Sequence, residues 1–126
     1  MPYVAVVDDE EQVRKALKRL LMASGFEVES YASGKEFLAT KHPPPDCVVL
    51  DLHMPGMSGL QVLEELRAAR RPLPTVIITA HDTVETRAQC LAAGASAYLR
   101  KPLDERVLLN SISASMAHAR SPTPKR

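Results

Sequence analysis

Short apolar runs that stop on a polar residue recur along this chain and constrain its fold most strongly. Four such runs occupy residues 4–7, 47–50, 76–78 and 97–100. Runs rich in Val, Ile and Leu that alternate with helical patterns are typical of buried parallel strands. Parallel strands all end at one edge of the sheet, which is where such folds place their sites. The residues that follow the runs are Asp8 with Asp9, Asp51, Thr79, and Lys101 with Pro102.

Length, charge and cysteine usage narrow the class of protein. The chain has 126 residues, is 45% hydrophobic and 25% charged, and carries a formal net charge of +1. These values predict one globular domain and give no support from charge for nucleic-acid or membrane binding. Cys47 and Cys90 show no C-x-x-C spacing, which favours two buried thiols in a reducing cytosol over a disulfide or a metal site. No apolar stretch approaches the length of a membrane span, so we expect a cytoplasmic protein.

Five strands and five helices are predicted to alternate along the chain. Residues 27–31 alternate polar and apolar side chains and supply the remaining strand, the second in chain order. Strict alternation requires a parallel sheet with helices on both faces and right-handed crossovers. The predicted architecture is a flavodoxin-like, doubly wound (βα)5 fold with strand order 2-1-3-4-5. Residues 1–119 form the predicted domain, and residues 120–126 are expected to be a disordered tail or the start of a linker.

Capping residues predict where four of the helices begin. A serine, threonine or aspartate before a helix accepts a hydrogen bond from a free backbone N–H of the first turn. The predicted capping residues are Ser33 (with Glu36), Ser58 (with Gln61), Asp82 (with Glu85) and Asp104.

The expected meeting of three carboxylates has a chemical consequence. At an effective dielectric constant of about 20, two such charges 4 Å apart repel each other by roughly 4 kcal/mol. With Lys101 counted, Asp8, Asp9 and Asp51 leave an excess of two negative charges. A divalent hard cation such as Mg²⁺ fits this site, and the absence of nearby His or Cys pairs argues against zinc.

An aspartate beside Mg²⁺, an ammonium group and a hydroxyl is a plausible acceptor of a phosphoryl group. Aspartyl phosphates are known covalent intermediates, and their formation depends mainly on positioning and on neutralising the phosphoryl oxygens. Lys101 and Thr79 are the candidates to bind those oxygens, and Thr79 could be drawn toward the phosphoryl group together with its loop.

Four motifs together make a family resemblance. They are the acidic pair in residues 7–10, the run from Leu50 to Gly59, Thr79 with Ala80, and Lys101 with Pro102. From Tyr3 to His118 the chain resembles a receiver domain of a bacterial two-component response regulator. The loop after Asp51 and the pair Gly94-Ala95 most resemble receivers of the nitrogen-fixation regulator type.

The resemblance implies a role for each residue of the acidic site. Asp51 is the phosphoacceptor, supplied by a sensor histidine kinase or a histidine phosphotransfer protein. Asp9 and Asp51 bind Mg²⁺ directly together with the backbone carbonyl of His53, whereas Asp8 acts through water. Mn²⁺ can substitute for Mg²⁺.

The resemblance also implies a switch. Thr79 and Ala80 bind the phosphoryl group with Lys101, the Lys101-Pro102 bond is cis, and Thr79 forms a switch pair with Tyr98. On activation the threonine hydroxyl moves in and the aromatic ring rotates inward. His53 and His81 flank the mouth of the site, and our hypothesis is that they tune hydrolysis of the aspartyl phosphate.

Three functions compete on the sequence. The first is a phosphorylation-controlled binding module. It is not expected to be an enzyme beyond self-catalysed phosphotransfer and slow autodephosphorylation. Its face formed by the fourth helix, fifth strand and fifth helix would switch for homodimerisation or partner binding. The second is the regulatory part of a helix-turn-helix transcription factor, although this domain itself is not expected to contact DNA. The third, an aspartate-dependent phosphatase of the haloacid-dehalogenase type, is disfavoured because that class needs a second aspartate where this chain has His53.

Overall fold

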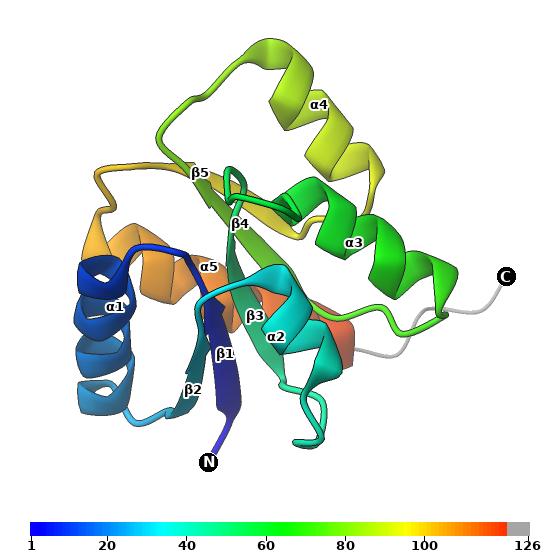
Figure 1. Cartoon of the computed structure of the whole chain (residues 1–126). Helices are drawn as coiled ribbons and strands as arrows, with labels where there is room; N and C mark the ends of the chain where they lie inside the picture. The colour runs from blue at the N-terminus through cyan, green and yellow to red at the C-terminus, as the bar shows by residue number, and fades with distance from the viewer. Residues whose placement is uncertain (121–126) are drawn as a thin grey trace, which may run out of the picture.

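A single parallel sheet forms the centre of the molecule, as the computed structural model of residues 1–120 shows (Figure 1). Its strand order is β2-β1-β3-β4-β5, and every neighbouring pair is parallel. The predicted flavodoxin-like order is therefore confirmed. The strands are β1 (Tyr3–Val7), β2 (Glu27–Tyr31), β3 (Cys47–Asp51), β4 (Thr75–Thr79) and β5 (Ala97–Arg100).

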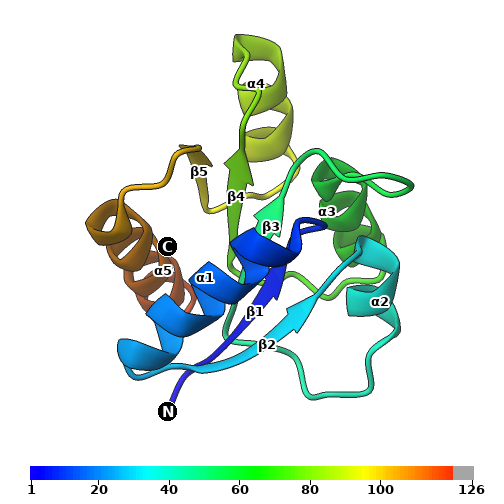
Figure 2. The same cartoon turned by 60° about the vertical axis from the view of Figure 1, so that its left-hand side comes forward.

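Helices cover both faces of this sheet (Figure 2). Side chains that alternate along β1 enter two different cores: Val4 and Val6 pack in one with residues of α1 and α5, whereas Ala5 and Val7 pack in the other with residues of α2, α3 and α4. The central strand β3 is buried along its whole length, as expected for a strand covered on both sides. The helices are α1 (Glu11–Ala23), α2 (Gly34–Ala39), α3 (Gly59–Ala68), α4 (Val84–Ala92) and α5 (Glu105–Arg120).

Capping predictions hold for three helices and fail for one. Ser33, Ser58 and Asp104 each accept a backbone N–H of the following helix. The prediction of Asp82 for α4 is wrong: Thr83 is the capping residue, and its hydroxyl accepts the N–H of Thr86 at 3.0 Å. The hydroxyl of Thr86 accepts the N–H of Thr83 in return at 3.2 Å. This reciprocal pair caps α4 at Thr83, one residue after the predicted capping residue.

The cysteines, the lengths of the helices and the end of α5 bear on three further expectations. Cys47 and Cys90 are both buried and free, as predicted. None of the helices in residues 1–120 is long and apolar enough to cross a membrane. Helix α5 continues through Arg120, and the tail predicted for 120–126 otherwise lies outside the described residues.

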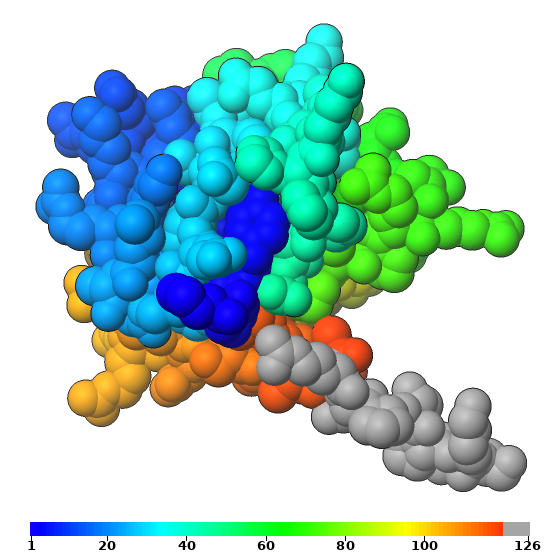
Figure 3. Space-filling model, turned by 90° about the horizontal axis from the view of Figure 1, so that it is seen from below, coloured from blue at the N-terminus to red at the C-terminus, as the bar shows by residue number. Residues whose placement is uncertain are grey.

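The two ends of the sheet differ in what they carry. Figure 3 shows the end where the strands begin, with the N-terminal segment in a hollow between β2 and the segment that precedes β3. Tyr3, Glu27 and Pro43 are among the residues that line this hollow. The acidic site predicted from the sequence lies at the opposite end of the sheet. Asp51 and Thr79 are the last residues of β3 and β4, whereas Asp8 and Lys101 directly follow β1 and β5.

Candidate functional site

Three carboxylates converge where β1 and β3 end. Their strands are hydrogen-bonded neighbours, and Val7, the last residue of β1, lies opposite Leu50. Carboxylate oxygens of Asp8, Asp9 and Asp51 all lie within 4.8 Å of one another. Asp8 and Asp51 are buried, whereas Asp9 is exposed to solvent. Segments more than forty residues apart in the sequence thus form one acidic site, as their positions at strand ends predicted.

Lys101 connects two of these carboxylates. Its Nζ lies 3.0 Å from Oδ2 of Asp8, 3.5 Å from Oδ1 of Asp51 and 3.6 Å from Oε1 of Glu10. Burial by itself lowers the pKa of Lys101, but the hydrogen bond to Asp8 and the charges of Asp51, Asp8 and Glu10 together raise it above its ordinary value. Lys101 therefore stays charged, and the Lys101-Pro102 bond is cis, as the resemblance implied.

The charge balance at Asp51 favours a bound cation. Burial, followed by the charges of Asp8 and then Asp9, raises the pKa of Asp51 to about 7, against the lowering effect of Lys101. One ammonium group therefore does not neutralise three carboxylates, and without a further cation Asp51 takes up a proton near neutral pH. Oxygen ligands at this spacing suit Mg²⁺ or Mn²⁺, so the side chains present fit the metal implied by the resemblance.

The close packing of α3 fixes the loop that follows Asp51. A Cβ atom on Gly59 would lie 2.5 Å from the carbonyl oxygen of Asp51 and 3.0 Å from Cα of Leu52. Glycine is thus required where α3 begins, and its N–H donates to the carbonyl of Leu52 at 2.8 Å. The position of α3 is therefore tied directly to the backbone of the acidic residue.

Thr79 and Tyr98 belong to the part of the site that faces α4. The buried hydroxyl of Thr79 accepts the N–H of His81 at 3.0 Å, which fixes the loop that starts at Ala80. The ring of Tyr98 is 7% exposed and already points into the core, and burial raises its pKa. The ring of Tyr98 therefore lies inward in this structure.

His53 and His81 lie against each other. Their rings meet edge to face, with centroids 5.4 Å apart and planes inclined by 77°. Both residues are exposed, and they come from the β3–α3 and β4–α4 loops. The sequence placed each residue near the site but did not predict that they touch.

Two further residues of the site escaped the sequence analysis. Glu10 contributes a carboxylate near Lys101, and its own N–H donates to Oδ1 of Asp8 at 2.9 Å. Arg14 donates from Nη1 to the backbone carbonyl of Asp8 at 2.8 Å. Available signals were the position of Glu10 beside the acidic pair and the position of Arg14 one helical turn further on.

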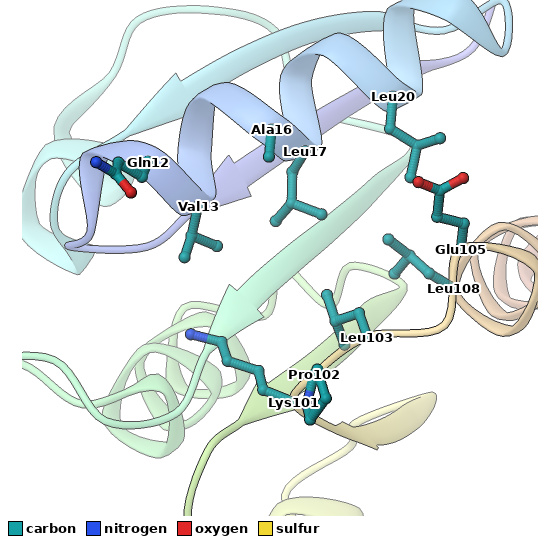
Figure 4. Close-up of a pocket in the computed structure, with 10 residues that line it drawn as sticks. All are labelled: Gln12, Val13, Ala16, Leu17, Leu20, Lys101, Pro102, Leu103, Glu105 and Leu108. Atoms are coloured by element: carbon teal, nitrogen blue, oxygen red, sulfur yellow. The ribbon is translucent and has the colours of Figure 1, made fainter.

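A groove of about 350 Å³ runs between α1 and α5 and ends at the acidic site (Figure 4). Val13, Leu17 and Leu20 of α1 face Leu103 and Leu108 across it. Lys101 lines one end of this groove while its ammonium group reaches Asp8 and Asp51. The side chain of Lys101 thus belongs to both the groove and the acidic site.

Comparison with known proteins identifies the family. A family model with the description "Response regulator receiver domain" matches residues 4–113. The transcriptional regulatory protein FixJ of Rhizobium meliloti is 36% identical over 119 residues, which cover 91% of this chain and 57% of that protein. The response regulator MprA of Mycolicibacterium vanbaalenii is 41% identical over 112 residues, which cover 88% of this chain and 48% of that protein. The crystal structure of FixJ-N superimposes with a TM-score of 0.86 at 34% identity and covers 94% of this chain and 95% of that one.

The fold, the acidic site and these matches agree: the chain belongs to the receiver domain family of response regulators. FixJ proteins are among its relatives, as the nitrogen-fixation-type resemblance predicted, and MprA proteins are also among them. The chain spans about half the length of the curated relatives it matches.

Proposed function

We infer that Asp51 accepts a phosphoryl group from a phosphohistidine on a sensor histidine kinase or a histidine phosphotransfer protein. A carboxylate oxygen of Asp51 forms the new P–O bond while the P–N bond of the donor histidine breaks. The observation that carries this proposal is the meeting of Asp8, Asp9 and Asp51 beside the ammonium group of Lys101. The cytoplasmic location expected from the sequence is part of the same proposal.

The residues around Asp51 have distinct tasks. Asp9 and Asp51, with the backbone carbonyl of His53, would hold Mg²⁺ or Mn²⁺, and Asp8 would act through water. When bound, the metal supplies positive charge near the phosphoryl oxygens. Lys101 donates to a phosphoryl oxygen, and the hydroxyl of Thr79, which now accepts from His81, turns to donate to another. Ala80 follows Thr79 and moves with it.

The output of this reaction is a change in the face made by α4, β5 and α5. To change the ratio of active to inactive conformation from 1:99 to 99:1, phosphorylation must stabilise the active conformation by about 5.5 kcal/mol more than the inactive one. A charge-assisted hydrogen bond supplies about 1.5–3 kcal/mol, so Lys101, Thr79 and the metal must act together. The result is homodimerisation or binding of a partner, and size-exclusion chromatography with and without beryllofluoride and Mg²⁺ distinguishes these outcomes.

A second candidate is that the chain is the regulatory part of a DNA-binding transcription factor. FixJ carries the name transcriptional regulatory protein, and this chain spans about half of it. A helix-turn-helix domain encoded in frame after Arg126 would support this candidate. A stop codon at that point would favour a stand-alone regulator.

His53 and His81 set the lifetime of the phosphoryl group in this proposal. Their rings touch at the mouth of the site and together can shield or orient the water that attacks the aspartyl phosphate. Their exposure and their origin in two different loops support this role.

The test is labelling by a small phosphodonor such as acetyl phosphate, followed by intact mass. We expect one phosphoryl group on the wild-type chain in Mg²⁺, and none in chelator or on Asp51→Asn. Asp46→Asn is the matched control, because Asp46 is an exposed carboxylate just before β3, at the opposite end of that strand from Asp51. Labelling that persists in Asp51→Asn, or full labelling in chelator, would contradict the proposal.

A further inference from the structure

The first turn of α4 is hydrogen-bonded to the buried aromatic residue of β5. The hydroxyl oxygens of Thr86 and Tyr98 lie 3.0 Å apart. Thr86 is also the third residue of α4 and forms the capping pair with Thr83. Its hydroxyl accepts the N–H of Thr83 and lies 2.9 Å from the hydroxyl of Thr83. One side chain thus takes part in both the helix cap and the contact with Tyr98.

The hydrogen-bonding capacity of Thr86 makes these contacts interdependent. A threonine hydroxyl has one donor and two acceptor positions. The N–H of Thr83 occupies one acceptor position. The one donor and one acceptor that remain are shared among three oxygens: the carbonyl of Thr83 at 3.2 Å, which accepts from Thr86, the hydroxyl of Thr83 at 2.9 Å and the hydroxyl of Tyr98 at 3.0 Å. A change in the Thr83 cap therefore alters the geometry available to the phenol of Tyr98.

The same cap is connected to Thr79 through a short segment. Thr79 accepts from the N–H of His81, and only Asp82 separates His81 from the capping residue Thr83. Movement of the Thr79 hydroxyl toward a phosphoryl group gives up this bond and releases the segment that leads to Thr83. Thr79 and Tyr98 are then connected through Thr83 and Thr86.

Few other contacts hold α4 near Tyr98. Cys90 is buried, while the other residues of α4, all described, are exposed or half-buried. The guanidinium carbon of Arg87 lies 5.7 Å from the centroid of the Tyr98 ring. Arg87 lies over the ring, so the polar end of Tyr98 is held by the hydroxyl of Thr86 at 3.0 Å together with the carboxylate of Asp82, just before the cap of α4.

We propose that Thr86 is a positioning residue whose hydroxyl holds Tyr98 inward and transmits movement of Thr79 to it through the α4 capping pair. The proposal rests on the proposed function only for the trigger at Asp51. The hydrogen bond itself belongs to the ligand-free chain and can be tested there.

The experiment compares Thr86→Val, which removes the hydroxyl with little change in shape, with Thr86→Ser, which keeps it. Each is made in the wild-type and in the Tyr98→Phe background, and urea unfolding checks that all variants fold. The first readout is the set of nuclear Overhauser contacts between the Tyr98 ring and core side chains in the ligand-free chain. The second is the affinity for beryllofluoride in Mg²⁺.

We expect Thr86→Val to weaken the inward ring contacts and to lower beryllofluoride affinity by about 2- to 12-fold, the effect of one hydrogen bond. Thr86→Ser restores both, and Thr86→Val has no further effect in the Tyr98→Phe background. An equal loss in both backgrounds would overturn the proposal, because Thr86 would then act through the helix cap alone.

The two proposals fail separately. If the wild-type chain does not bind beryllofluoride, the proposed function falls, and the ring contacts of the ligand-free chain decide the role of Thr86. Unchanged inward contacts in Thr86→Val overturn it, and their loss with recovery in Thr86→Ser supports it.

Discussion

Helices α3 and α4 lie on the same side of the sheet but are held there very differently. Helix α3 buries Gly59, Val62, Leu63 and Leu66, and its first residue packs directly on the backbone of Asp51. Helix α4 buries Cys90, and its first residue, Val84, is 82% exposed. Figure 1 shows α4 standing away from the sheet, whereas α3 lies along it.

This difference in packing concerns which parts of the molecule can move and which are held in place. Strand ends and α3 fix the acidic residues, because moving them would expose a large apolar core. The weaker packing of α4 allows it to move at low cost, since elements with few buried contacts open most easily. In the proposed function, the phosphorylation chemistry belongs to the rigid part, which is made of the strand ends and α3, and α4 is the part that responds.

Truncation of one leucine on each helix gives the largest expected effect. Leu63 is 4% exposed and Leu91 is 46% exposed. We expect Leu63→Ala to lower the free energy of unfolding by about 2–5 kcal/mol. Leu91→Ala should lower it by less than about 1 kcal/mol, because much of this side chain is already in water. Urea denaturation measures both, and equal losses would mean that α4 is held as firmly as α3.

Removal of the ammonium group that lies beside Asp8 and Asp51 comes next. We expect Lys101→Ala still to accept a phosphoryl group, slowly, while the gain in dimer or partner affinity on phosphorylation falls about 10-fold or more, since a charge-assisted hydrogen bond is lost. Lys15→Ala is the control, because Lys15 forms an exposed ion pair with Glu11 at 3.3 Å. Wild-type switching in Lys101→Ala would remove the role given to this residue.

The raised pKa of Asp51 predicts how pH affects the rigid part in chelator. A folded-state pKa of about 7 against an ordinary value of 3.8 means that the folded chain holds a proton that the unfolded chain has released. Stability should therefore fall as pH rises from about 4 to about 7, and Asp51→Asn should remove this component. Thermal melting at pH 5 and pH 8 checks the sign. Stability that rises over this interval in wild type relative to Asp51→Asn would show the assignment to be wrong.

Replacement of the two histidines should have the smallest effect. His53→Ala and His81→Ala are expected to change the lifetime of the aspartyl phosphate by roughly two- to tenfold, which corresponds to at most about 1.4 kcal/mol in the barrier. Because the rings touch, the double variant should differ from the sum of the single effects. Decay of the phosphorylated chain, followed by intact mass, measures this. Unchanged lifetimes in both single variants would discard the tuning role.

Sequence reasoning succeeded where strands decide the geometry. Asp51 and Thr79 are the last residues of buried strands, and Asp8 and Lys101 directly follow β1 and β5. Parallel pairing leaves little freedom in where such residues lie. The pattern of apolar runs was therefore sufficient to predict both the sheet order and the acidic site.

It failed where a weakly packed helix decides the geometry. Asp82 and Thr83 are both good capping residues, and only the placement of α4 selects Thr83. The contact between Thr86 and Tyr98 depends on that same placement and has no periodic signal in the sequence. The contacts of Glu10 and Arg14 with the acidic site depend likewise on how α1 leaves β1.

The last turn of α4 is hydrogen-bonded to α3, and this bond limits how α4 can be displaced. Arg67, near the end of α3, donates from Nη1 to the carbonyl of Ala92 at 3.1 Å. This fastening ties the carboxyl-terminal end of α4 to the rigid helix, while the opposite end depends on two threonines. Any displacement of α4 would therefore be a rotation about Ala92, and Val84, at the opposite end of the helix, would move farthest.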